Sequence, residues 1–113
     1  MEMSVDALED GITRITLTGR MDYAAATAND ASLLKVAERD KFLLVDLSKM
    51  TFLASMGIRT LLVTAKAAKE AGGKMVFFQP ELTVAKVLTG SGTDLLVPVY
   101  YDLKSAREAL KSS

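Results

Sequence analysis

The sequence contains no cysteine and no histidine. Without cysteine the chain forms neither disulfides nor thiolate metal sites, which fits a reducing compartment. Without either residue, the Ser-His and Cys-His pairs of nucleophilic catalysis cannot be built. A carboxylate-only site or a Mg²⁺ site stays open at this point, but we expect a protein that is not an enzyme and has no catalytic residues, no bound metal and no cofactor.

Neither sign of charge is in excess, and long apolar runs are missing as well. Lys plus Arg number 14 and Asp plus Glu number 14, so the formal net charge is zero. Because phosphate binding needs a basic surface or stripe, this balance argues against a nucleic-acid partner.

The longest apolar run, residues 95–101, is far shorter than the roughly 20 residues of a membrane span. The acidic start, residues 1–6, lacks the order of a secretory signal. We expect a soluble cytoplasmic protein with no membrane insertion.

The length and composition predict one domain. The chain has 113 residues, and 50% of them are hydrophobic, which is enough for one core and not for two. No repeat, low-complexity tract or linker is visible. We therefore expect a single domain over residues 1–113.

The spacing of apolar residues predicts strands and helices in alternation. Residues 4–18 predict an antiparallel hairpin that turns at residues 9–11, with Gly19 at its end. Apolar runs at residues 42–45 and 75–78 predict strands buried on both faces, and residues 97–100 predict a last strand. Helical spacing follows at residues 24–39, 56–71 and 82–88, and again after Asp102, a suitable N-cap.

This order, ββαβαβαβα, predicts the α/β fold class. Helices that separate buried apolar strands imply parallel pairing through right-handed crossovers. The expected architecture is a single-layer mixed β-sheet with an N-terminal antiparallel hairpin and crossover helices.

Residues 46–58 differ from ordinary connecting sequence. A buried strand ends, a short loop follows, and Ser55 lies just before the clearest helix. Serine is a favoured N-cap, so Ser55 has a purely structural interpretation. Alternatively its hydroxyl is a phosphorylation target, because the N–H groups and dipole at a helix start tolerate a phosphate.

The same segment resembles the central motif of STAS domains, the family of bacterial anti-sigma-factor antagonists. In that family a strand leads through a short loop to Asp-Ser-Ser-Gly-Leu at a helix start, and the matching residues here are Ala54-Ser55-Met56-Gly57-Ile58. Residues 17–22 resemble the family's Leu-x-Gly-x-hydrophobic-Asp, and residues 71–76 are similar to its Gly-Gly turn into an apolar strand. Residues 84–92 look like its next helix and loop. The resemblance covers nearly the whole chain in order.

The resemblance implies a STAS-like fold and a switch by partner exchange. The unmodified antagonist binds an anti-sigma factor that is also a serine kinase, with ATP bound by that partner. The kinase phosphorylates the motif serine, here Ser55, the antagonist dissociates, and a phosphatase resets it. We predict that the partner-binding surface comprises Asp22, Tyr23, Ala54, Ser55, Met56, Gly57 and Arg59. Asp22 has an equally simple interpretation as the N-cap of a helix that begins near Tyr23.

Three positions depart from the family and keep other functions open. Ala54 replaces the usual Asp, Met56 replaces the second Ser as an exposed apolar candidate, and Arg59 replaces a small residue. Arg59 either pairs with a phosphate on Ser55 or is a solvated helix residue. The alternative function is constitutive docking on another assembly, such as the ATPase subunit of a lipid transporter or a stress-signalling complex. Weak nucleotide hydrolysis is a third hypothesis, for which the sequence offers no phosphate-binding loop.

Overall fold

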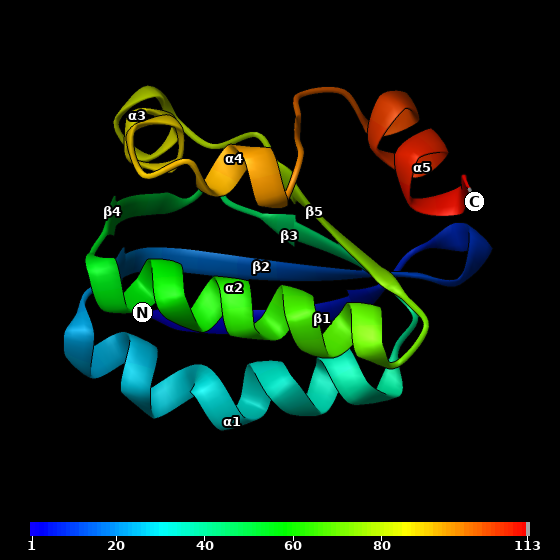
Figure 1. Cartoon of the computed structure of the whole chain (residues 1–113), viewed down its shortest axis with the longest axis horizontal. Helices are drawn as coiled ribbons and strands as arrows, with labels where there is room; N and C mark the ends of the chain where they lie inside the picture. The colour runs from blue at the N-terminus through cyan, green and yellow to red at the C-terminus, as the bar shows by residue number, and fades with distance from the viewer. Residues whose placement is uncertain (113) are drawn as a thin grey trace.

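The computed structural model describes residues 1–112, which form one mixed β-sheet with helices packed against it (Figure 1). The strands are β1 (Glu2–Ala7), β2 (Ile12–Met21), β3 (Phe42–Asp46), β4 (Met50–Leu53), β5 (Lys74–Phe78) and β6 (Val99–Tyr100). The helices are the 3₁₀ turn η1 (Glu9–Gly11), α1 (Tyr23–Arg39), α2 (Ser55–Glu70), α3 (Leu82–Gly90), α4 (Thr93–Leu96) and α5 (Leu103–Lys111).

The strand pairing confirms the predicted fold class. The order across the sheet is β1-β2-β3-β5-β6, and β4 pairs with β2 beyond the end of β3. β1 and β2 are antiparallel, whereas β2–β3, β3–β5 and β5–β6 are parallel. The parallel strands therefore end at a common edge, where the loops and helix starts that follow them are gathered.

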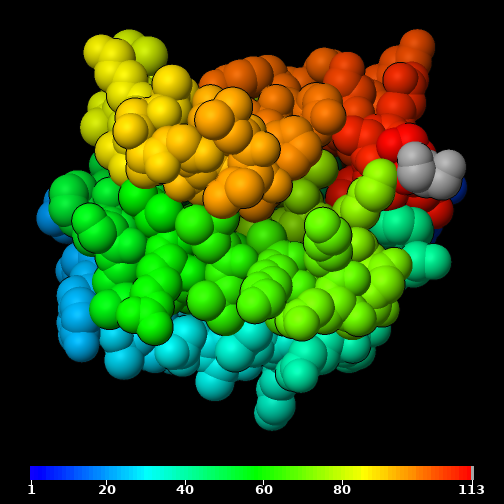
Figure 2. Space-filling view, in the orientation of Figure 1, coloured from blue at the N-terminus to red at the C-terminus, as the bar shows by residue number. Residues whose placement is uncertain are grey.

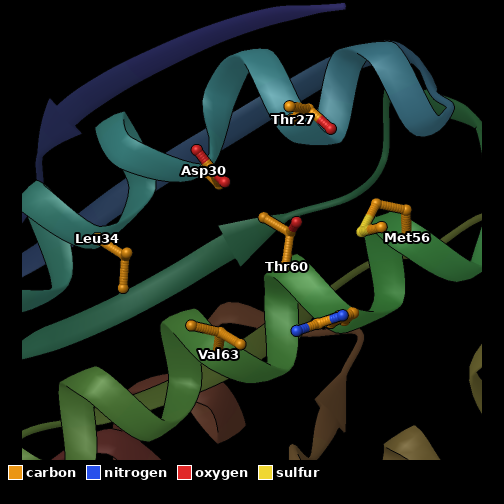
Figure 3. A pocket seen from close by; sticks show the side chains of 7 residues that line it. Thr27, Asp30, Leu34, Met56, Thr60 and Val63 are labelled. Carbon is orange, nitrogen blue, oxygen red and sulfur yellow. The ribbon is translucent and has the colours of Figure 1, made fainter.

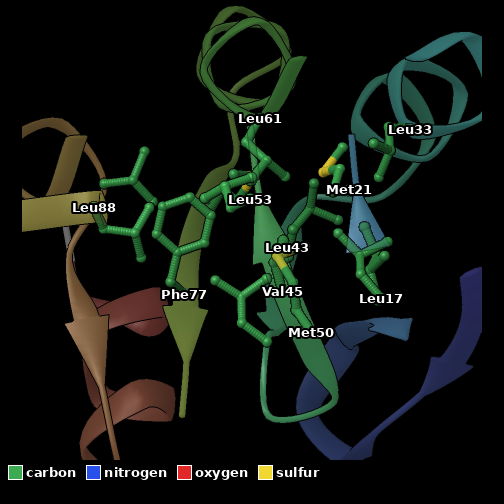
Figure 4. Packing of buried hydrophobic residues seen from close by; sticks show 14 of the residues in the cluster. Leu17, Met21, Leu33, Leu43, Val45, Met50, Leu53, Leu61, Phe77 and Leu88 are labelled. Atoms are coloured by element: carbon green, nitrogen blue, oxygen red, sulfur yellow. The ribbon is translucent and has the colours of Figure 1, made fainter. Parts of the chain in front are cut away.

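Two apolar clusters hold the sheet between its helices. On one face, alternate side chains of β2, β3 and β5 pack against α1, α2 and α3, and Figure 4 shows Leu17, Val45 and Phe77 among them. On the other face, a smaller cluster joins the sheet to α5 through Ala106 and Leu110. Because β3 and β5 are covered on both faces, they have the continuous apolar sequences of buried parallel strands.

Two elements were not predicted, so the observed order is ββαββαβααβα. The residues of β4 were expected to belong to a loop. A segment of four residues that follows the polar Ser48 and Lys49 is too short to show the alternation of apolar and polar side chains that marks a strand. β2 was expected to end at Gly19, but it continues to Met21 across a register shift between Gly19 and Arg20, and this extension pairs with β4.

The second unpredicted element, α4, directly precedes the strand that was expected at residues 97–100. The apolar run at residues 95–101 has strand length, yet only Val99 and Tyr100 pair with β5. Thr93 is buried while Leu95 and Leu96 face solvent, so this helical turn has no apolar face toward the core. The short helix at residues 82–88 is confirmed as α3, but it buries Val84 and Leu88 and leaves Leu82 exposed.

Candidate functional site

The starts of α1 and α2 lie next to each other because the ends of β2 and β4 are paired. Met21 is the register partner of Leu53, and the N–H of Ala54 donates to the carbonyl oxygen of Met21 at 3.0 Å. α1 begins two residues after Met21, at Tyr23, and α2 begins one residue after Ala54, at Ser55. The strand pairing thus brings together two segments that are more than 30 residues apart in the sequence.

Ser55 is exposed and is the first residue of α2. The expectation that Ser55 caps this helix is wrong, because Ala54 occupies the N-cap position with extended backbone angles (φ −87°, ψ 167°). The carbonyl of Ala54 accepts the first helical hydrogen bond, from the N–H of Ile58 at 3.1 Å. Within residues 1–112, no side chain caps α2 and no hydrogen bond engages the Ser55 hydroxyl.

Gly57 positions this helix start and does not form part of the accessible surface. It is buried, and a Cβ at this position would lie 2.7 Å from Leu53 Cδ1 and 3.0 Å from the carbonyl oxygen of Met21. Any larger residue would force Leu53 Cδ1 to move and would crowd the Met21 carbonyl, so glycine suits the close approach of α2 to β2 and β4. Direct contact of Gly57 with a partner stays a prediction, and its buried position indicates a part in placing Ser55.

Asp22 acts as the N-cap of α1, as one of its two interpretations predicted. Its Oδ1 accepts a hydrogen bond from the N–H of Ala25 at 2.9 Å. The neighbouring Tyr23 has 65% of its surface exposed. Asp22, Tyr23 and the exposed Ser55 hydroxyl therefore lie at the same edge of the sheet, where β2 and β4 end.

Met56 and Arg59 face a groove of about 340 Å³ between α1 and α2. Met56, an exposed apolar candidate by sequence, is half-buried and packs against the main core. Arg59 is exposed. The labelled side chains of Figure 3 reach toward the groove from both helices. The lining residues are Thr27, Asp30, Leu34, Met56, Arg59, Thr60 and Val63.

Sequence reasoning missed the residues of α1 that line this groove, and it missed Arg20, a cationic neighbour of Asp22. Asp30 and Leu34 lie in the middle of α1, where ordinary helical spacing gives no sign of a second helix alongside. Arg20 lies over the Phe52 ring, with its guanidinium carbon 4.2 Å from the ring centroid. Because Arg20 and Phe52 are register partners on β2 and β4, this contact reinforces the pairing beneath the site.

A partly buried ion pair between Arg14 and Asp46 fixes the turn that leads into β4. Asp46 is only 1% exposed, and its Oδ2 accepts a hydrogen bond from Arg14 Nε at 3.0 Å. Its Oδ1 accepts from the N–H of Ser48 at 2.9 Å. Burial alone would raise the pKa of the Asp46 carboxyl, but the hydrogen bonds from Ser48 and then Arg14 outweigh it and lower that pKa. The ionised carboxylate therefore holds residues 46–48 in the turn.

Among residues 1–112 no group of three or more acidic, histidine or cysteine side chains is placed to hold a metal ion. No helix in the same part of the chain is both long and apolar enough to cross a bilayer.

Comparison with known protein families decides what this arrangement is. The family model for the STAS domain matches residues 6–106. The chain belongs to the STAS domain family. The match confirms the resemblance seen in the sequence motifs around Ser55, and it covers all the predicted site residues.

Relatives of this STAS domain are named for anti-sigma factor antagonism. A Bordetella bronchiseptica protein, provisionally named anti-sigma factor antagonist BtrV, is 26% identical over 114 residues, which cover 100% of this chain and 97% of that protein. An anti-sigma factor antagonist from Mycobacterium paratuberculosis has a TM-score of 0.83 at 24% identity, over 98% of this chain and 94% of that one.

The fold also matches SpoIIAA, an anti-sigma factor antagonist known in two forms. The unphosphorylated form gives a TM-score of 0.77 at 17% identity, over 97% of this chain and 96% of that one. The phosphorylated form, from Bacillus, gives 0.70 at 15% identity, over 96% and 99%. This protein is thus a STAS domain that resembles anti-sigma factor antagonists along their full length.

Proposed function

We propose that this STAS domain binds an anti-sigma factor and is released from it by phosphorylation of Ser55. The partner is a serine kinase that supplies its own bound ATP, and a phosphatase restores the unmodified form. The observation that supports this most strongly is the Ser55 hydroxyl, which is exposed at the first position of α2 and makes no hydrogen bond within the described chain.

The start of α2 suits a hydroxyl that becomes charged. A phosphate adds about −1.5 to −2 charges at neutral pH. The N–H groups of the first turn of α2 have no side-chain cap among the described residues, and the positive end of the helix dipole favours an anion there. The folded domain therefore tolerates the phosphate, and the free energy of partner binding changes instead.

The same charge opposes a partner that covers the site. A dianion that is removed from water at an interface is costly unless the partner supplies cations. In this proposal Tyr23, Ala54, Met56 and Arg59 surround Ser55 in the covered surface, and Asp22 lies at its border. Arg59 is exposed within the groove and is in no ion pair in the described part of the chain, so it remains available to a carboxylate of the partner or to the phosphate.

Intact mass after kinase treatment tests the modification. The domain is incubated with the purified anti-sigma kinase and ATP, and one added phosphate is expected. The gain should disappear in Ser55→Ala and persist in Ser32→Ala, a matched control because Ser32 is an exposed serine in the middle of α1. An unchanged mass with a kinase that nevertheless binds the domain would favour constitutive docking, the alternative function. A phosphate retained in Ser55→Ala would place the modification elsewhere.

A further inference from the structure

Two adjacent leucines of α4 are almost fully exposed. Leu95 is 86% exposed and Leu96 is 72% exposed. Figure 2 shows the orange α4 region on the molecular surface, between the yellow α3 and the red C-terminal helix. A single exposed leucine is ordinary, whereas two adjacent ones, of which Leu96 lines a groove, are typical of a binding surface.

A groove of about 620 Å³ begins directly beside these leucines. Leu96, Val97 and Pro98 form part of its lining, and α2, β5 and α5 supply the rest. Most of the lining is apolar. The remaining lining residues are Ala65, Lys69, Gly72, Gly73, Lys74, Met75, Val76, Tyr100, Ala109 and Ser112.

The charges of the groove and of α4 are opposite. The charged residues that line the groove within residues 1–112 are both lysines. Lys74 is occupied, since its Nζ donates to the carbonyl oxygens of Ala109 and Ser112 near the end of α5. Lys69 is exposed and is in no ion pair in the described part of the chain. On α4, Asp94 precedes the two leucines; its Oδ2 accepts a hydrogen bond from Thr89 Oγ1 at 3.2 Å, but its carboxylate is in no ion pair in the described part of the chain.

We infer that α4 and this groove together form the interface of a weak homodimer. α4 presents apolar side chains and a carboxylate, and the groove presents apolar side chains and an ammonium group, so the surface complements a second copy of itself. Under two-fold symmetry, Leu95 and Asp94 of one copy face the groove and Lys69 of the other, and the reverse contact forms at the same time. Leu95 does not line its own groove and is therefore available to the second copy.

Side chains, and not strand pairing, carry this contact. β6 is the edge strand, and Pro98, which precedes it, has no N–H to donate to a neighbouring strand.

Lys69 lies 14 residues after Ser55 on α2, which corresponds to about 21 Å along the helix axis. The dimer therefore leaves both Ser55 surfaces open, and it stands independently of the proposed phosphorylation switch.

Sedimentation equilibrium up to about 1 mM protein tests the interface. We expect a reversible dimer with a dissociation constant on the order of 100 µM, since two leucines and one ion pair per copy carry the contact. The variant Leu95→Glu with Leu96→Glu should be monomeric throughout that range. Leu82→Glu should dimerise like the unmodified chain, because Leu82 is similarly exposed (71%) but lies on α3, outside the groove. A monomer at every concentration, or an equal loss in Leu82→Glu, would overturn the inference.

Charge exchange and NMR dilution give two further checks. Lys69→Glu and Asp94→Lys should each weaken the dimer, and the double variant should recover affinity because the pair is restored with its signs exchanged. In the unmodified chain, amide shifts that change on dilution should map to α4 and the groove. Failure of the double variant to recover, or shift changes confined to the Ser55 region, would contradict this interface.

Discussion

The N–H of Ala54 donates to the carbonyl oxygen of Met21 at 3.0 Å, and this single bond joins the ends of β4 and β2. It is the last link of a ladder in which Leu53 is paired with Met21. Beyond it the two chains separate into α1 and α2. The bond therefore determines that Tyr23 and Ser55 are presented together, although neither residue takes part in it.

Gly57→Ala should destabilise the fold, because the added methyl group would lie 2.7 Å from Leu53 Cδ1, closer than real contacts allow, and 3.0 Å from the Met21 carbonyl oxygen. Overpacking of this kind costs about 1–3 kcal/mol. Gly90→Ala is the matched control, since a Cβ at Gly90 meets no atom within 4 Å. Urea denaturation measures both variants, and equal stability of the two would show that α2 does not need this close approach.

Asp22→Ala should lower the free energy of unfolding by about 1 kcal/mol, because α1 loses its N-cap. Asp22→Asn keeps an oxygen that accepts the same hydrogen bond and should retain most of the stability. Thermal denaturation separates the two variants. If Asp22→Asn is stable but binds the partner more weakly, the charge of Asp22 contributes to the interface as well as to the cap. If Asp22→Ala loses no stability, the capping hydrogen bond does not contribute to the free energy of unfolding.

Much of this arrangement follows from the sequence, for reasons that differ by element. β3 and β5 are continuous apolar runs and α2 has a regular apolar stripe, so pattern alone predicts them. β4 is short, and within residues 1–112 it pairs with the end of β2 from Gly19 onward, which no local pattern reveals. Ser55 could be placed near a helix start, but the choice of Ala54 as N-cap depends on the backbone that β4 imposes.

The groove beside Ser55 could not have been predicted in the same way. Its two walls come from α1 and α2, and their contact depends on the tertiary packing of both helices over the sheet. Met56 illustrates the difficulty, because a methionine at a helix start suits either a surface or a core, and here it packs against the core.

Stability should fall at acid pH partly through Asp46. The hydrogen bonds of Ser48 and Arg14 overcome the effect of burial and lower the pKa of this carboxyl in the folded state. Its contribution is therefore complete above the unfolded value of about 3.9 and is lost as the pH falls through the folded value. Asp46→Asn should be less stable than the unmodified chain at pH 7 and should lose less stability on acidification. A residual pH dependence should remain, because the hydrogen bond from Arg39 also lowers the pKa of Asp40.

Urea denaturation at neutral and acid pH measures this difference. Parallel loss of stability in Asp46→Asn and the unmodified chain would show that the Arg14–Asp46 pair does not contribute to the acid sensitivity.

Tyr23→Ala should weaken partner binding without a large loss of stability, because most of the Tyr23 surface is exposed beside Ser55 and tyrosine is enriched among residues that dominate interfaces. Tyr101→Ala is the matched control, since Tyr101 is 57% exposed and follows β6, outside the predicted surface. Calorimetric titration with the anti-sigma factor compares them. An equal loss of affinity in both variants would place the interface elsewhere.

The most direct measurement is the affinity of the anti-sigma factor for the domain with and without a phosphate on Ser55. Phosphoserine is incorporated at this position alone, and circular dichroism establishes that both forms are folded. The desolvation of a dianion predicts that binding is at least about 10-fold weaker in the phosphorylated form. Equal affinities for the two folded forms would contradict the switch and leave Ser55 as an ordinary surface residue of α2.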